Sequence, residues 1–150
     1  MEKINDLDIG TAGEHLVCAD LILKGHKAFL SAAGLHYDIL TDLNGSLIKI
    51  QVKTTRKPSP ISLIKDRSKR YLINIRRMGK NGRKEYTEKE VDVFAVVALD
   101  IKKIAYIPIK KIQQTMVFRD EKPLNQSKEA RYFDDLTFEK AMEEYYESKM

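Results

Sequence analysis

Hydrophobic and polar residues alternate on both sides of Asn44-Gly45. This dipeptide between two apolar-rich runs predicts a β-hairpin, because a type I′ turn needs positive φ at both central residues. With a two-residue loop, Asp38 faces Gln51 across the hairpin, and alternation along the second strand places Gln51 and Lys53 on one face. A bulge would shift this register by one residue and separate the three side chains.

The pattern of the whole chain predicts an α/β fold with a mixed central β-sheet flanked by helices. The run 91–99 is almost entirely apolar, which is typical of a strand buried on both faces. A projecting basic β-hairpin is predicted to turn at 78–82, and Asp135 is the expected cap of the last helix. Periodicity and turn residues predict the other elements: helices at 11–24, 108–112 and 137–148, strands at 27–30, 61–64, 71–77 and 104–109, and an irregular stretch at 119–133.

Glu14 lies at the top of the apolar face of the helix predicted at 11–24. With Thr11 as the N-cap, the Glu14 carboxylate would close a capping box by bonding the Thr11 amide. Alternatively, the carboxylate points from the first turn toward the sheet beneath. Both interpretations stay open, and both hold if the helix begins over the hairpin. Gly25 is the expected C′ residue. The apolar face itself consists of Val17, Cys18, Leu21 and Ile22.

The composition indicates one globular domain over residues 1–150, with 43% hydrophobic residues. No apolar run approaches the roughly 18 residues of a membrane span, and the first residues lack the pattern of a signal peptide. The single cysteine, Cys18, excludes an intramolecular disulfide and a cysteine-based zinc site. These features predict a cytoplasmic protein with no membrane partner.

The positive charge of the chain is concentrated between residues 49 and 84. This segment holds thirteen Lys or Arg residues and one acidic residue, a local charge of +12, so the remainder carries −7 of the net +5. Such a segment favours a polyanionic partner, most simply nucleic acid. A solvated charged face is the alternative, but ordinary surfaces mix both signs of charge.

One face of the predicted hairpin is suited to metal-dependent cleavage of a phosphodiester. Asp38 offers a charged ligand, while Gln51 and the carbonyl of Val52 offer neutral oxygens of the kind that Mg²⁺ accepts. Lys53 could orient or deprotonate a water, or stabilise the charge that develops on the phosphate. Glu14 could add a further ligand, directly or through water.

Spacing alone does not separate such a site from a surface ion pair of Asp38 with Lys49 or Lys53. Longer motifs are more specific. Three segments are distinctive, together with the strand pair 91–97 and 104–108: Gly10-Thr-Ala-Gly-Glu14, Tyr37-Asp38-Ile-Leu40 and Gln51-Val-Lys53-Thr-Thr55. In these segments the chain resembles the PD-(D/E)xK nuclease superfamily, and it is closest to the small homing endonucleases encoded by bacterial group I introns. Holliday-junction resolvases and restriction enzymes share the core. The resemblance covers residues 10–112, and an irregular segment with a helix follows at 113–150.

This resemblance implies which residues act. The glutamate on the superfamily's helix falls on Glu14, its metal-binding aspartate on Asp38, and its lysine on Lys53. The second acidic residue falls on Gln51, which makes the site one charge less negative than usual. Tyr37 stands where the motif has its proline.

The resemblance also implies a site-specific homing endonuclease that cuts double-stranded DNA with Mg²⁺. Mn²⁺ would be an alternative cofactor, and Ca²⁺ would bind without supporting cleavage. A symmetric homo-oligomer, a tetramer, is implied because one small active site cuts one strand. The enzyme would act at the bacterial nucleoid. The alternatives are a junction resolvase or restriction-type nuclease, and a DNA-binding module whose nuclease site has decayed, as Gln51 would allow.

The basic segment is expected to contact the DNA. Two-stranded ribbons fit the major groove, where arginine reads guanine with two hydrogen bonds. The candidate residues follow the active-site strand, line one loop and line the projecting hairpin: Arg56, Lys57, Lys65, Arg67, Lys69, Arg70, Arg76, Arg77, Lys80, Arg83 and Lys84.

Overall fold

A computed structural model describes residues 3–59, 69–75, 77–79, 82–84, 86–120 and 131–150. At its centre is a five-stranded sheet with the strand order β1-β2-β3-β7-β8. The pair β3 and β7 is parallel and the other neighbours are antiparallel, so the predicted mixed sheet is confirmed. Its strands are β1 (Lys27–Leu30), β2 (Ile39–Leu43), β3 (Ser46–Thr55), β7 (Val93–Ala98) and β8 (Lys103–Pro108).

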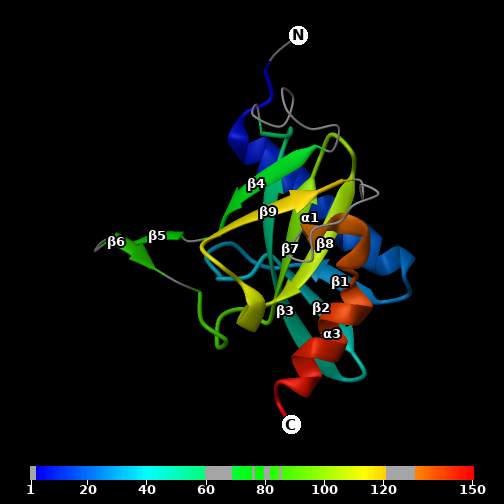
Figure 1. Ribbon diagram of the computed structural model, residues 1–150. Helices are drawn as coiled ribbons and strands as arrows, with labels where there is room; N and C mark the ends of the chain where they lie inside the picture. The colour runs from blue at the N-terminus through cyan, green and yellow to red at the C-terminus, as the bar shows by residue number, and fades with distance from the viewer. Residues whose placement is uncertain (1–2, 60–68, 76, 80–81, 85, 121–130) are drawn as a thin grey trace.

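The central sheet is covered by helices on one face and by a second sheet on the other (Figure 1). Side chains at 93, 95 and 97 of β7 pack toward the helices, and those at 94, 96 and 98 pack toward the second sheet. All six are fully buried, which confirms the strand predicted within 91–99. The covering elements are α1 (Asp6–Leu23), α3 (Phe138–Glu147), β4 (Arg70–Asn74), β9 (Thr115–Arg119) and β10 (Arg131–Tyr132).

The helix α1 begins earlier than predicted. Its N-cap is Asn5, whose side chain accepts a hydrogen bond from the amide of Asp8 at 2.8 Å. The Thr11 hydroxyl instead donates to the carbonyl of Leu7 within the helix, so the predicted N-cap and capping box are wrong. Gly25, at φ 94°, confirms the predicted helix end.

The apolar face of α1 is narrower than the sequence predicted. Val17 and Leu21 are fully buried against the sheet, whereas Ile22 is 52% exposed. Cys18 is half-buried at the edge of this core. The buried stripe therefore follows every fourth residue, and Ile22 falls outside it.

The last helix confirms its prediction to within one residue at each end, but its cap differs. The hydroxyl of Thr137 accepts a hydrogen bond from the amide of Lys140 at 3.2 Å. Asp135, the predicted cap, lies in the short 3₁₀ helix η2 (Phe133–Asp135) that precedes α3. A second 3₁₀ helix, η1 (Ile109–Lys111), lies where the helix at 108–112 was predicted.

The hairpin of β2 and β3 has the predicted turn and register. Asn44 has φ 54° and Gly45 has φ 89°, as a type I′ turn requires. The pairs run from Leu43 opposite Ser46 to Ile39 opposite Ile50 without a bulge. The strand positions of the candidate site are therefore those that the alternation predicted.

The basic hairpin consists of β5 (Arg77–Gly79) and β6 (Gly82–Lys84) and projects from the body of the molecule (Figure 1). The strand predicted at 61–64 lies outside the described residues. In the part of the chain that is described, no helix has the length and apolar character needed to cross a membrane.

The buried carboxylate of Asp92 ties β3 to α3 and β7. One oxygen accepts the amide of Lys49 at 2.9 Å, and the other accepts the hydroxyl of Tyr145 at 3.1 Å. The backbone amide of Asp92 donates in turn to the Lys49 carbonyl. Because a buried carboxylate needs such partners, these bonds hold β3 in place at the strand segment that leads to the candidate site.

Candidate active site

Asp38 lies one residue before β2, where regular pairing with β3 stops. Its amide donates to the carbonyl of Ile50, and its own carbonyl accepts the amide of Ser31, both at 2.8 Å. Its carboxylate accepts the amide of Val52 at 2.9 Å. The carboxylate therefore takes the place of a backbone acceptor and is held against the peptide that joins Gln51 to Val52.

Glu14 reaches Asp38 from the third turn of α1. The two carboxyl groups share a hydrogen bond, in which a protonated Glu14 is the donor. Burial, the hydrogen bond to Asp38 and the charge of Asp38 together raise the pKa of Glu14 to about 7, and burial is the largest of these causes. The interpretation that Glu14 points to the sheet is thus confirmed.

A glycine allows α1 to come this close to β3. Gly13 is buried, and a Cβ at this position would overlap Oγ1 of Thr54 and lie 2.9 Å from its Cβ and Cγ2. Only a residue without a side chain fits there. The contact sets the distance between the helix and the strand, and hence the position of the adjacent Glu14.

The raised pKa of Glu14 makes the stability of the metal-free protein dependent on pH. The unfolded chain releases this proton near pH 4.5 and the folded chain near pH 7, so the folded state binds more protons in between and loses stability as the pH rises. We expect Glu14→Gln, which cannot ionise, to melt a few degrees above the wild type at pH 8 in EDTA. At pH 5 the difference should be much smaller, as measured by thermal unfolding.

Glu143→Gln provides the control, because Glu143 is an exposed carboxyl on α3. Its difference from the wild type should be the same at both pH values. A Glu14→Gln difference that does not grow between pH 5 and pH 8 would contradict the assigned cause.

Gln51 and Lys53 lie on the face of β3 opposite the buried side chain of Val52. Both are half-buried, and the ammonium of Lys53 donates to the hydroxyl of Tyr86 at 3.1 Å. The ammonium of Lys49 donates to the carbonyl of Lys89. Neither lysine forms an ion pair with Asp38, so the surface ion pair considered from the sequence is wrong.

The donor set around Asp38 fits a hard divalent cation. No group of three His, Cys, Asp or Glu side chains arranged to hold a metal occurs in the described parts of the chain. Glu14 and Asp38 supply two carboxylates, and Mg²⁺ takes one or two of these with waters and neutral oxygens for the rest. Two carboxyl groups that share a proton form a site where a cation is favoured. Gln51 and the Val52 carbonyl are the neutral oxygens that sequence adds to this set.

The residues expected to contact DNA are only partly described. Arg56 and Lys57 are exposed directly after β3, while Lys69 lies 4.0 Å from Asp100 in an ion pair and Arg70 begins β4. The backbone of the projecting hairpin carries Arg77, Arg83 and Lys84. Lys65, Arg67, Arg76 and Lys80 lie outside the described residues.

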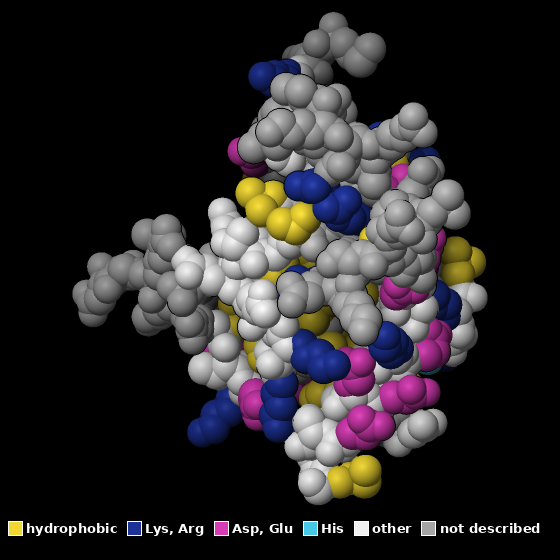
Figure 2. Space-filling view, viewed as in Figure 1, with side chains coloured by type: hydrophobic (Ala, Val, Ile, Leu, Met, Phe, Trp, Pro, Cys, Tyr) yellow, Lys and Arg dark blue, Asp and Glu magenta, His cyan; other side chains and the backbone are white. Residues whose placement is uncertain are grey.

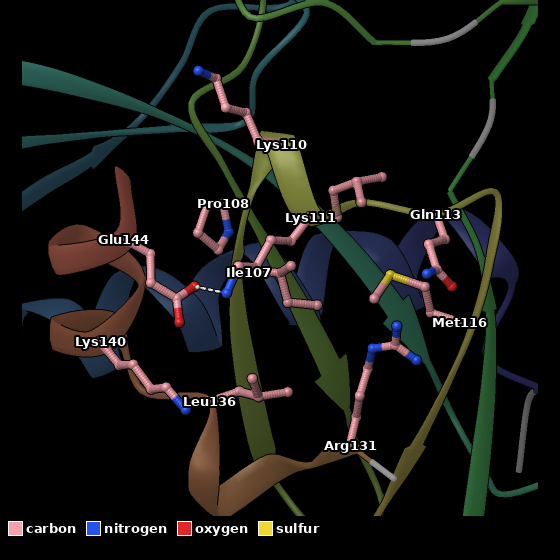
Figure 3. Close-up of a pocket in the computed structure, with 11 residues that line it drawn as sticks. Ile107, Pro108, Lys110, Lys111, Gln113, Met116, Arg131, Leu136, Lys140 and Glu144 are labelled. Carbon is pink, nitrogen blue, oxygen red and sulfur yellow. Dashed lines mark ion pairs between the residues drawn. The ribbon is translucent and has the colours of Figure 1, made fainter. Parts of the chain in front are cut away.

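A cavity of about 400 Å³ lies between η1, β8, β9 and α3 (Figure 3). Apolar side chains such as Ile107 and Met116 line it together with Arg131, and Lys111 pairs with Glu144 at 3.0 Å. Figure 2 shows hydrophobic side chains at the bottom of a hollow on this side of the molecule, with basic side chains beside them. None of the candidate active-site residues lines this cavity.

The sequence did not identify Tyr86 as part of the site. This residue lies four positions after the turn predicted at 78–82, and it carries no motif of its own. Its ring packs edge-on against that of Phe94, with centroids 5.2 Å apart, and its hydroxyl meets Lys53. Only the packing of the sheet brings these residues together.

Comparison with known proteins finds a matching family and a similar fold. The model of the PD-(D/E)XK endonuclease family matches residues 4–139. The fold is similar to that of a bacterial homing endonuclease, I-Ssp6803I, with a TM-score of 0.72 and 14% sequence identity over 98% of this chain and 99% of the other. No match was found among curated proteins.

Proposed function

Because this chain belongs to the PD-(D/E)XK endonuclease family, we propose that it is a site-specific DNA endonuclease of the homing type. It would make metal-dependent double-strand breaks in a long DNA target. The observation that carries this proposal is the pairing of the Glu14 and Asp38 carboxyl groups, with Asp38 bound to the Val52 amide on the strand that also carries Lys53. The similarity in fold to a homing endonuclease supports the homing type.

Each residue of the site has a role in this proposal. Asp38 and Glu14 hold Mg²⁺ together with the oxygens of Gln51 and of the Val52 carbonyl; Mn²⁺ would fit the same donors. When bound, the metal polarises the phosphate and lowers the pKa of a water. Lys53 stabilises the charge that develops on the scissile phosphate. Since Gln51 contributes no charge, the site depends on Glu14 for its second carboxylate.

The basic segment would bind the DNA on either side of the cleaved bond. The exposed Arg56 and Lys57 follow the active-site strand directly, and the projecting hairpin carries further arginines and lysines. Such a ribbon has the width of the major groove. Because one active site cuts one strand, two active sites of a symmetric homo-oligomer would cut both strands of the DNA. We propose that this oligomer is a tetramer.

The first test is cleavage of supercoiled plasmids that carry a library of candidate intron-insertion sites, in the presence of Mg²⁺, Ca²⁺ or EDTA. We expect linear product with Mg²⁺ only, with breaks that map by sequencing to one site. Binding measured by gel shift should persist in Ca²⁺, which occupies the donors without supporting cleavage.

Other outcomes would favour the alternatives. Cleavage of a four-way junction in preference to any linear target would indicate a resolvase. Many short recurrent sites would indicate a restriction-type enzyme. Tight DNA binding without cleavage in any metal would mean that Gln51 marks a decayed nuclease site and that the protein is a binding module.

A further inference from the structure

The ammonium of Lys53 has a neutral partner. It donates to the hydroxyl of Tyr86 at 3.1 Å and lies 5.2 Å from the centre of the Tyr86 ring. No carboxylate forms an ion pair with it in the described regions. A phenol oxygen and an aromatic face hold a cation in place without neutralising its charge.

Tyr86 is itself held firmly. Its ring meets the ring of Phe94 edge-on at an interplanar angle of 82°. Phe94 is fully buried on β7 and pairs with Gln51 in the neighbouring strand. Tyr86 therefore packs on the same strand pair that carries the candidate site, and its hydroxyl has a defined position relative to β3.

Tyr86 also lies where the basic hairpin returns to the central sheet. It follows β6 by two residues, and the turn after it leads into β7. That turn is closed by Glu90, which accepts the amide of Thr87 at 3.2 Å. The residue that meets Lys53 thus comes from the segment that joins the expected DNA-binding element to the sheet.

We propose that Tyr86 is a positioning residue for Lys53, an inference that rests on the proposed nuclease function. A lysine side chain has four rotatable bonds and loses much rotamer freedom when it is fixed. By accepting one hydrogen bond, Tyr86 selects one rotamer of Lys53 and fixes the ammonium on the face of β3 that also carries Gln51. The ammonium keeps its full charge and further donors for a phosphate oxygen. A carboxylate at this position would compete with the phosphate for the same cation.

The test compares cleavage rates of Tyr86→Phe, Lys53→Ala and the double variant in single-turnover reactions with Mg²⁺. Tyr86→Phe keeps the ring and removes the acceptor. We expect it to cut about 10- to 100-fold more slowly, because small misplacements of a reacting group have effects of this size. Its DNA affinity in Ca²⁺ should stay within about twofold of the wild type, since one neutral hydroxyl adds little to a phosphate interface. In the Lys53→Ala background, Tyr86→Phe should cause no further loss.

Tyr71→Phe is the matched control. It also removes a tyrosine hydroxyl from the second core, one that donates to Asp100 at 2.9 Å instead of to Lys53, and it should cut at the wild-type rate. Wild-type cleavage by Tyr86→Phe, or a further loss when it is added to Lys53→Ala, would overturn the proposal.

A second measurement separates this inference from the proposed function. The NMR signal of a lysine ammonium is visible only when hydrogen bonding protects it from rapid exchange. We expect a Lys53 ammonium signal in the metal-free protein and its loss in Tyr86→Phe. A wild type that cuts no DNA would refute the nuclease function alone, whereas an ammonium signal unchanged in Tyr86→Phe would refute the positioning role alone.

Discussion

Asp38→Asn is expected to slow DNA cleavage by about 10²–10³-fold and to leave the fold intact. Under the proposed mechanism, Asp38 is the carboxylate that binds the metal and is fixed to the β3 backbone. Loss of about 3–4 kcal/mol of transition-state stabilisation corresponds to a rate loss of this size. In the wild type, the Asp38 carboxylate accepts a hydrogen bond from the Val52 amide at 2.9 Å. The side-chain oxygen of asparagine can accept the same hydrogen bond, so the hairpin should not open. Single-turnover cleavage and thermal unfolding measure the two effects.

Asp42→Asn is the matched control for this variant. Asp42 is an exposed carboxylate on the same hairpin, and it likewise accepts a backbone amide, that of Gly45 at 2.9 Å. It lies outside the proposed site, so cleavage should stay at the wild-type rate. Equal losses in the two variants would assign the effect of Asp38 to the hairpin instead of to a metal.

The hairpin that carries Asp38 could be predicted in detail because its signals are local. Asn44-Gly45 specifies the turn, the turn specifies the register, and alternation specifies the face of each side chain. The same holds for β7, whose continuous apolar run needs burial on both sides. In each case neighbouring residues carry the whole signal.

The start of α1 was predicted wrongly because two capping signals compete in this segment. Thr11 and Glu14 have the spacing of a capping box, and Gly10 before them is a poor helix former. Asn5 is an equally good cap, and Asp6 and Asp8 favour the positive end of the helix dipole. Burial of the helix on the sheet outweighs the local cost of a glycine inside it.

The second sheet and the contact to Tyr86 could not be predicted, because both depend on distant residues. In the second sheet, β4 lies beside β9, with the backbone of Arg70 opposite that of Arg119. In the site, Lys53 contacts Tyr86, which lies 33 residues further along the chain. The alternating burial of β9, with Met116 and Phe118 inside, follows a period of two. That period predicts a strand but names no partner, and pairing across such a separation is decided by tertiary packing.

Gly13→Ala is expected to destabilise the fold by about 2 kcal/mol, although alanine is the better helix former. A Cβ at this position would overlap Thr54 on β3, and overpacking of this kind typically costs about 1–3 kcal/mol. To relieve the overlap, α1 must move away from the strand and take Glu14 with it, so cleavage should also fall. Urea unfolding measures the first effect, and single-turnover cleavage in Mg²⁺ measures the second.

Gly10→Ala is the matched control, since it introduces the same methyl group one turn earlier in α1 with nothing within 4 Å. There the helix propensity acts alone, and stability should rise by about 1 kcal/mol. Adding Thr54→Ala to Gly13→Ala should restore part of the lost stability, because it removes Oγ1 and Cγ2 but keeps the Cβ of Thr54, 2.9 Å from the new methyl group. If Gly13→Ala proved as stable as Gly10→Ala, the close contact of α1 with β3 would not hold Glu14 in place, and the pairing of Glu14 with Asp38 would need another cause.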